Sequence, residues 1–415
     1  MMPAATNSMR ICFLCQGYPP APHGGIGTFT QSLARALVRA GHQAWVIGRH
    51  SRSDPAPAYE EDQGVHVWRY RGPAHLLSRA RIRYELFRTV AGWSRSGKID
   101  LVEAPDCAGW IAGWPRLPVP IVVRLHGSLT YLAAELGQPV DRTALLLERA
   151  SFRRADFWCS VSQYAAHKTQ QLFGLRGDRP TILYNPVDVP LETLAPTRSK
   201  NQIVFTGGLK VNKGILSLIK AWPQVVEVSP EAELHIFGRD RPTDDGQSMQ
   251  AFVLSRLEHQ IGKSVRFHGF GDRGQIFHAL QTARLAVFPS YAEAFAQAPM
   301  EAMACGCPTV YTRRTSGPEL IDHDQTGLLI DPDQPDEIAN AIIRLLMDDA
   351  LARRLGEAGR KRIQENFSSE ILVRQNEAFY RNCLRHFRGT HVRRTPSFWT
   401  RGFRSAVSTR NHDPD

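Results

Sequence analysis

The sequence predicts an α/β protein made of two doubly wound parallel-sheet domains in tandem. Strand-like apolar runs alternate with amphipathic helical segments along the chain, which is the pattern of a parallel sheet with helices on both faces. The alternation stops at the polar, proline-containing stretch VDVPLETLAPTRSKN (residues 187–201) and then starts again. The length of 415 residues also exceeds what one ordinary hydrophobic core supports.

The first predicted domain covers residues 9–190, behind a flexible N-terminus at residues 1–8. Its first strand is RICFLCQG (residues 10–17), and a helix follows whose apolar side chains recur at helical spacing up to Gly41. Later apolar runs of this half continue the alternation, namely AWVIG, DLVEAP, PIVVRLHG, FWCSVS and TILYN.

The second predicted domain covers residues 202–366 and follows a linker at residues 191–201. It repeats the same start, with a strand (QIVFTGG), a glycine turn and an amphipathic helix (KGILSLIKAWPQVVEV). Further strand candidates are ELHIFG, VRFHGF, LAVFPS and PTVYT. A C-terminal helix is predicted at residues 367–387, and the basic tail at residues 388–415 lacks periodicity and is expected to be disordered.

The composition favours a protein that stays in the cytoplasm. It has 42% hydrophobic and 22% charged residues, and its first residues, MMPAATNSMR, lack the apolar core of a signal peptide. No apolar run is long enough to span a bilayer.

The seven cysteines are expected to be packing residues. Cys12 and Cys15 point to opposite faces of a strand, and Cys305 and Cys307 have no partners at metal-ligand spacing. The sequence predicts no metal site and no cofactor.

The net charge of +11 is concentrated in the first half of the chain and in the tail. Such a distribution suits an anionic surface or a phosphate-bearing partner. The segment from Arg69 to Arg88 carries six Arg and one Glu. This segment and the basic tail are candidates for contact with an anionic membrane surface, which would make the protein peripheral on the cytoplasmic face. The alternative is an exposed helix without a partner; nucleic acid is disfavoured because no recognition motif accompanies the charge.

Two glutamates stand out in YAEAFAQAPMEAMACGCP (residues 291–308), a segment that is otherwise small and apolar. It follows the strand LAVFPS, so Glu293 lies where doubly wound sheets bind their ligands. Pro299 suits the first turn of the next helix and Gly306 its end, which places Glu301 in the first turn. The free N–H groups of a helix start favour phosphate, and carboxylates accept hydrogen bonds from sugar hydroxyls. The segment fits a ligand with both a diphosphate and sugars; otherwise Glu301 complements the helix dipole and Glu293 is solvated.

This segment, extended to PSYAEAFAQAPMEAMACGCPTV, resembles the E-x7-E signature of the retaining nucleotide-sugar glycosyltransferases of the GT-B fold, family 4 type. The resemblance implies that Glu293 meets the donor sugar and Glu301 the nucleotide ribose. It also implies that the backbone amides of Phe295, Ala296 and Gln297 reach the sugar hydroxyls or phosphate, although the family usually has Gly in place of Ala296.

Further motifs match the family in the same order over residues 9–385. The segment YPPAPHGGIGTFTQSLARALVRAGH is similar to its glycine-rich first loop, where Gly24, Gly25 and Gly27 would let the backbone approach phosphate and acceptor. RLHG resembles the loop that holds a His near the reacting centre, here His126. The resemblance implies a GT-B architecture, in which an acceptor-side domain and a nucleotide-sugar donor domain, both Rossmann-like, face a central cleft.

Two further matches are less specific. SVSQYAAHKTQQLFG contains Ser162, which can simply cap the helix that follows it. SGPELIDHDQTGLLIDP contains Glu319, which fits a site residue and a surface residue equally well.

One departure concerns the donor clamp. The family commonly reads G-R-L-x-x-x-K-G after the first strand of the second domain, and this chain reads GGLKVNKG from Gly207 to Gly214. Lys213 matches the clamp lysine, whereas Gly208 stands where the arginine is expected. Lys210 can supply charge nearby, but a point charge does not reproduce a bidentate guanidinium.

The resemblance implies a retaining hexosyltransferase that moves a hexose from a nucleotide-diphosphate sugar to a hydroxyl of a glycan or lipid-linked acceptor, in cell-surface polysaccharide or glycolipid synthesis. Lys213, helix N-termini and backbone amides would stabilise the leaving diphosphate, and His126 would orient the reacting sugar. Two alternatives stay open: a non-catalytic GT-B protein that binds a nucleotide sugar, which Gly208 supports, and a nucleotide-sugar epimerase. A dehydrogenase is poorly supported because GGIG is not G-x-G-x-x-G.

Overall fold

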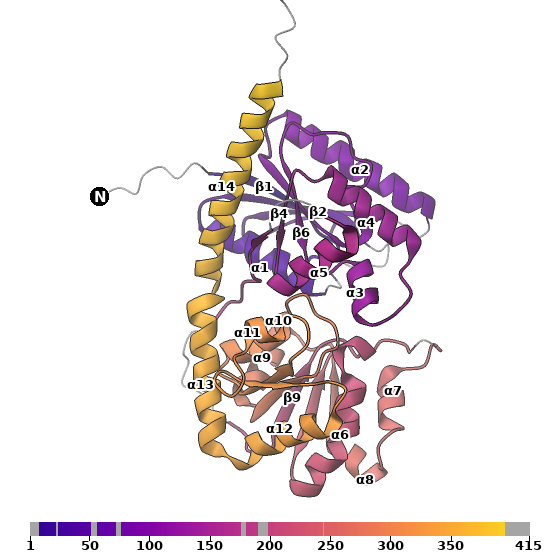
Figure 1. The fold of residues 1–415 in the computed structure, drawn as a ribbon, viewed down its shortest axis with the longest axis vertical. Coiled ribbons are helices and arrows are strands. Elements are labelled where there is room, and N and C mark those ends of the chain that lie inside the picture. Colours follow the sequence, from indigo (N-terminus) through magenta and orange to yellow (C-terminus); the bar gives the residue numbers. More distant parts are fainter. Residues whose placement is uncertain are drawn as a thin grey trace, which may run out of the picture.

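The computed structural model describes residues 8–21, 24–50, 56–71, 76–175, 180–189, 198–243 and 245–394. Most of the predicted N-terminus and linker and most of the basic tail lie outside these ranges. The described chain forms two α/β units, one above the other in Figure 1. Each has a twisted sheet with helices on both faces, as the sequence predicts.

The first unit contains an eight-stranded sheet in the order β3-β4-β2-β1-β5-β6-β7-β8. Its strands are β1 (Arg10–Leu14), β2 (Gln43–His50), β3 (Tyr59–Asp62), β4 (Val65–Arg71), β5 (Leu101–Pro105), β6 (Ile121–Leu125), β7 (Phe157–Ser160) and β8 (Thr181–Ile182). The covering helices are α1 (Gly25–Arg39), α2 (Leu76–Arg95), α3 (Leu129–Glu135), α4 (Arg142–Arg154) and α5 (Gln163–Phe173), with a short 3-10 turn, η1 (Cys107–Gly109).

The edge strand β3 is antiparallel to β4, and the sequence analysis does not anticipate it. Its residues, Tyr-Glu-Glu-Asp, carry no apolar alternation. A two-residue turn makes the hairpin, because Gln63 and Gly64 both have positive φ, of 50° and 84°. The Asp62 carboxylate at this turn accepts hydrogen bonds from Tyr18, Gln31 and Arg35, which fixes the hairpin against α1.

The second unit contains a six-stranded parallel sheet in the order β11-β10-β9-β12-β13-β14. Its strands are β9 (Gln202–Thr206), β10 (Glu233–Phe237), β11 (Val265–Gly269), β12 (Leu285–Phe288), β13 (Thr309–Thr312) and β14 (Leu328–Ile330). Its helices are η2 (Val211–Lys213), α6 (Ile215–Val228), α7 (Met249–Leu254), α8 (His259–Gly262), α9 (Arg273–Thr282), α10 (Gln297–Ala304), α11 (Gly317–Leu320), α12 (Pro335–Met347) and α13 (Asp349–Asn366).

Both sheets reverse their strand order next to the first strand of the unit. In the first sheet β1 lies between β2 and β5, and in the second β9 lies between β10 and β12. At such a reversal the loops from neighbouring strands leave in opposite directions and open a crevice at the carboxyl ends of the strands. The fold therefore provides one crevice per unit.

The C-terminal helix α14 (Ser369–Arg394) runs along one side of both units in Figure 1. It packs against the first unit through a buried network, in which Arg124 on β6 bridges Glu103 on β5 to Asn376 and Tyr380 of α14. Removing Arg124 or Glu103 would leave its partner's charge buried without compensation, and Asn376 and Tyr380 tie α14 to this pair, so the network fixes where α14 docks.

The predicted boundary between this helix and the tail is wrong. The sequence predicts a helix over residues 367–387 and irregular chain from 388, whereas the helix continues to Arg394. Loss of the apolar pattern after Phe387 does not end a helix whose backbone hydrogen bonds continue. Arg394 is also the last residue that the structure describes. The rest of the tail lies outside the described residues.

Candidate active site

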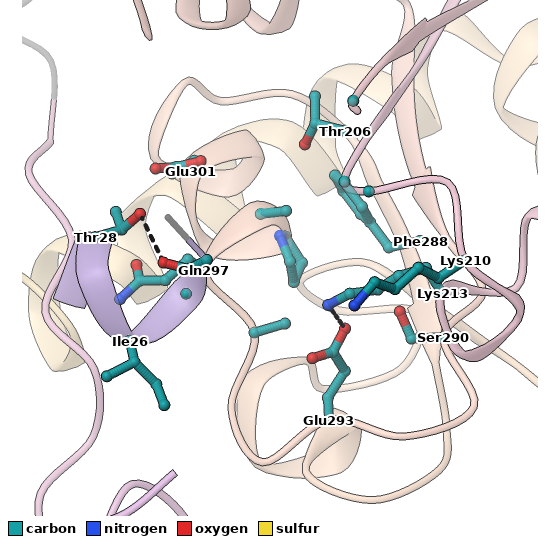
Figure 2. Close-up of a pocket in the computed structure, with 18 of the residues that line it drawn as sticks. Ile26, Thr28, Thr206, Lys210, Lys213, Phe288, Ser290, Glu293, Gln297 and Glu301 are labelled. Atoms are coloured by element: carbon teal, nitrogen blue, oxygen red, sulfur yellow. Dashed lines mark hydrogen bonds and ion pairs between the residues drawn. The ribbon is translucent and has the colours of Figure 1, made fainter. Parts of the chain in front are cut away.

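A cavity of about 590 Å³ lies between the two units, where the carboxyl ends of both sheets meet. It is lined by the N-terminus of α1 and the loop after β6 from the first unit, and by the loops after β9, β10 and β12 from the second. In Figure 2 the labelled side chains from α1, from the end of β9 and the loop after it, and from the segment between β12 and α10 surround one space. Of the residues predicted from the sequence, all but Gly27 line it: Gly24, Gly25, His126, Gly207, Gly208, Lys210, Lys213, Glu293, Phe295, Ala296, Gln297 and Glu301.

The glycine-rich first loop brings a helix N-terminus to the cavity. Gly24 is the N-cap of α1 in an extended conformation, and no side chain caps this end. A Cβ on Gly24 or Gly25 would meet nothing within 4 Å, so these glycines leave the first turn open to a ligand. Gly27 is buried inside α1 and does not line the cavity, contrary to the role expected for it.

A second glycine turn, at Gly214, positions Lys213, the lysine of the expected donor clamp. Gly214 has a φ of 73°, and a Cβ there would lie 1.7 Å from the carbonyl oxygen of Pro289, so only glycine lets this turn pack against the end of β12. The contact brings Lys213 to Glu293, and their side chains form an ion pair, visible in Figure 2. The Glu293 side chain is only 12% exposed, so this pair is partly shielded from water.

More cations line the second unit's side of the cavity than the sequence analysis identified. Burial lowers the pKa of Lys210, and the charges of Arg241 and Lys213 lower it further. Arg239 lies over the Phe270 ring at 4.2 Å, and both residues line the cavity together with Arg241 and Arg273. This concentration of positive charge suits a diphosphate.

Gly208 leaves open space where the family has arginine. A Cβ at this position would meet nothing within 4 Å, and the backbone there has no positive φ. The missing arginine is therefore not replaced by a bulky neighbour. The nearby positive charge comes from Lys210 and Arg241 instead.

Glu301 is the fifth residue of α10, one position beyond the first turn in which the sequence analysis places it. Its side chain lines the cavity, and burial raises its pKa to about 7, with Arg273 lowering and Asp188 raising it. In Figure 2 it lies on the opposite side of the cavity from Lys213. A carboxyl group so placed is a ready acceptor for hydroxyl groups.

The amides predicted to contact the ligand are not equivalent. Ala296 is the N-cap of α10 in an extended conformation, and its backbone lies near Tyr311, whose pKa is raised by burial. Phe295 is buried, and its ring lies 4.9 Å from that of Tyr184. Gln297 begins α10 and points toward Thr28 of α1 across the cavity in Figure 2.

His126 follows β6 and enters the cavity from the first unit. Its ring lies 4.6 Å from that of Phe29 in an edge arrangement. Burial and the Arg124 charge hold its pKa well below the ordinary value, so the imidazole is neutral at pH 7. A neutral imidazole offers one hydrogen-bond donor and one acceptor to a sugar.

Asp106 is a residue that the sequence analysis missed. It directly follows β5 and accepts a hydrogen bond from the backbone N–H of His126 at 3.0 Å. Burial raises its pKa to about 7, and its Oδ2 has no partner among the described residues. Its position at the carboxyl end of the strand DLVEAP is the signal that could have identified it.

Ser162 and Glu319, whose roles the sequence analysis left open, each form hydrogen bonds between the two units. Ser162 caps α5 by accepting a hydrogen bond from Ala165 N–H, and it also donates to the Ala294 carbonyl. The Glu319 carboxylate accepts hydrogen bonds from the N–H groups of Gln163 and Tyr164, both at 2.8 Å. Glu319 does not line the cavity; it caps a helix of the other unit.

Models of known families match both halves of the chain. The model of the family "Glycosyltransferase Family 4" matches residues 23–190, and that of "Glycosyl transferases group 1" matches residues 192–362. A glycogen synthase of Mycobacterium tuberculosis is 26% identical over 405 residues, which covers 90% of this chain and 94% of that protein.

Two solved structures show the same fold. Sucrose-phosphate synthase from Thermosynechococcus elongatus has a TM-score of 0.78 at 23% identity and covers 91% of this chain and 100% of its own. HepE of Anabaena, solved in complex with UDP and glucose, has a TM-score of 0.69 at 20% identity and covers 89% of this chain and 99% of its own. The chain therefore belongs to the group 1 glycosyltransferases of the GT-B fold.

Proposed function

We propose that this glycosyltransferase is a retaining hexosyltransferase that uses a nucleotide-diphosphate hexose as donor and a hydroxyl of a glycan or lipid-linked molecule as acceptor. The observation that carries the proposal is the paired Lys213 and Glu293 in one cavity with Glu301 and the N-terminus of α10. Together these groups match the parts of such a donor. The UDP and glucose bound by HepE, which has the same fold, agree with this class of ligand.

In this proposal the donor lies along the second domain. The diphosphate occupies the space between Lys213, Lys210 and Arg241, and the ribose hydroxyls donate to Glu301. The hexose then lies near Glu293, with its hydroxyls also in reach of the neutral His126. The cations and the free N–H groups of the helix are already in place before the reaction. They therefore stabilise the charge that develops on the leaving group without having to move.

The reaction breaks the bond between the anomeric carbon and the leaving phosphate oxygen. The acceptor oxygen forms the new bond on the same face, which retains the configuration, and its proton passes to the departing diphosphate. Lys213 is then released from Glu293 to balance the charge of the diphosphate. We assign the stabilisation of this charge to the protein's own cations, so the proposal requires no metal ion or other cofactor.

The acceptor side belongs to the first domain. We place the protein in the cytoplasm, peripherally on an anionic membrane, where a lipid-linked acceptor would reach the cavity in the synthesis of cell-surface polysaccharide or glycolipid. Helix α2 supports this, because Ile82 and Leu86 are buried against the sheet while Arg81, Tyr84 and Arg88 are exposed. Among the described residues, none of the helices has the length and apolarity needed to cross a bilayer.

The two alternatives make different predictions. A non-catalytic GT-B protein binds a nucleotide sugar without releasing the nucleotide, and Gly208 is the feature that favours it. An epimerase forms product without an acceptor. The Lys213–Glu293 pair and the cations around it favour the transferase, because they stabilise a leaving diphosphate.

The donor site is tested by a thermal-shift screen against UDP, GDP, ADP and their hexose conjugates. A ligand that binds the folded state raises the melting temperature. We expect a rise with one nucleotide that the Glu301→Ala variant loses and the Glu365→Ala variant, which alters an exposed glutamate on α13, retains. The absence of any rise in the wild-type protein would contradict the proposed donor site.

A further inference from the structure

We propose that Tyr131, Ser162 and Asn185 of the first domain are positioning residues that hold the donor loop, defined as residues 289–296 between β12 and α10. The inference rests on the proposed function, since the loop carries Glu293. It goes beyond that function because it assigns the geometry of the donor site to side chains of the opposite domain.

Three successive carbonyl groups of the donor loop accept hydrogen bonds from the first domain. Tyr131 Oη donates to the carbonyl of Glu293 at 3.0 Å, and Ser162 Oγ donates to that of Ala294 at 2.6 Å. Asn185 Nδ2 donates to that of Phe295 at 2.7 Å. The three donors come from α3, from the N-cap of α5 and from the segment after β8, so three separate elements converge on one loop.

These hydrogen bonds are shielded from water. Tyr131 and Ser162 are fully buried, and Asn185 is 4% exposed. Tyr131 belongs to the same hydrophobic cluster as Ala294 and Phe295, so apolar packing is continuous across the domain boundary. Away from water, such hydrogen bonds are stronger and an unmade one is costly.

Close steric contact accompanies the hydrogen bonds. A Cβ added to Gly127, which follows His126 with a φ of 88°, would lie 3.3 Å from the Cβ of Ala294. The loop that carries His126 therefore approaches the donor loop as closely as glycine permits. The hydrogen bonds from Tyr131, Ser162 and Asn185 thus also fix the distance between the two halves of the site.

Because peptide groups are planar, these hydrogen bonds also fix the orientation of the neighbouring backbone groups of the donor loop. In a trans peptide the carbonyl and the following N–H point in opposite directions. Since the carbonyl of Phe295 is held toward the first domain, the N–H of Ala296 points away from that domain. The same fixed peptides orient the Cα of Glu293 and direct its carboxylate to Lys213.

The second domain restrains other parts of the same loop. Its first residues are held by Tyr291 N–H, which donates to Asn212 at 2.8 Å, and by Ser290 N–H, which donates to Phe288. The carbonyl groups of Glu293, Ala294 and Phe295 accept hydrogen bonds from the first domain, whereas the Glu293 side chain pairs with Lys213 and the Phe295 ring lies 5.5 Å from that of Phe367. The backbone geometry of the donor loop therefore depends on contact between the two domains.

The test compares wild-type protein with a Tyr131→Phe/Ser162→Ala double variant and with Tyr164→Phe. Tyr164 is the matched control, because its hydroxyl donates to Glu135 within the first domain and not to the donor loop. The assay measures hexose release from the nucleotide hexose chosen by the thermal-shift screen. We expect kcat of the double variant to fall about tenfold to a hundredfold, with less than about threefold change in the donor KM, since the contacts of the nucleotide with Glu301 and the cations remain.

Small-angle X-ray scattering without ligand supplies a second readout that needs no activity. The double variant is expected to have a larger radius of gyration than the wild type, and Tyr164→Phe an unchanged one. A wild-type kcat and radius in a folded double variant would overturn the inference, as would an equal loss in Tyr164→Phe. If the wild-type protein itself releases no hexose, the proposed function fails, and the scattering comparison still decides whether these residues hold the domains together. The single variants repeat both measurements if the double variant does not fold.

Discussion

At the scale of single residues, the site depends on where charge is placed and on where a side chain is missing. Lys213 and Glu293 form an ion pair, and burial raises the pKa of Glu301 to about 7. Gly208 removes the guanidinium that the family uses at this point, while Lys210, Arg239, Arg241 and Arg273 line the same cavity. The positive charge around the diphosphate is thus spread over several side chains instead of one bidentate clamp.

This distribution predicts that Gly208→Arg strengthens donor binding. The position has open space and no positive φ, so arginine adds charge-assisted hydrogen bonds without strain. We expect the dissociation constant for the nucleoside diphosphate to fall about tenfold, as one such bond allows, when measured by isothermal titration calorimetry. Gly208→Met is the control for side-chain bulk. Weaker binding in Gly208→Arg than in Gly208→Met would show that the space serves another part of the ligand.

At the scale of elements, sequence periodicity predicts most strands and helices because each buries one regular face. It predicts neither β3, whose pairing depends on a two-residue turn, nor the last turns of α14, which lack an apolar face. The E-x7-E loop could be located because it follows a buried strand. Asp106 could have been identified by its position at the carboxyl end of β5, whereas Asn185 could not be assigned, because its role depends on a contact with Phe295, 110 residues away in the chain.

Helix α2 carries the prediction about the membrane. Its exposed side presents Arg81, Tyr84 and Arg88, and each basic residue near an anionic surface contributes about 1 kcal/mol. We expect the protein to sediment with phosphatidylglycerol vesicles and not with phosphatidylcholine vesicles. Arg81→Glu/Arg88→Glu should weaken this binding at least about tenfold, whereas Arg353→Glu/Lys361→Glu on α13 should have a smaller effect. Equal binding by both double variants would exclude α2 as the membrane contact.

At the scale of the whole molecule, the two domains form one site. The first contributes His126 and the hydrogen bonds to the donor loop, and the second contributes the cations and both glutamates of the E-x7-E segment. The cleft between the domains is an expectation from the family resemblance, whereas the tandem domains themselves could be predicted from the repeated pattern of strand, glycine turn and helix. The contacts across the boundary could not, because Ser162 and Glu319 bind atoms more than a hundred residues away in the chain.

The measurement that tests the central claim most directly is ¹H NMR of hexose released from an α-linked nucleotide hexose by the purified protein. We expect slow release, with the α-anomer appearing first because a retaining transferase preserves the donor's configuration, and we expect Lys213→Met to abolish it. Initial formation of the β-anomer would contradict retention. No release from any nucleotide hexose that the protein binds would contradict the assignment as a transferase and favour the non-catalytic alternative.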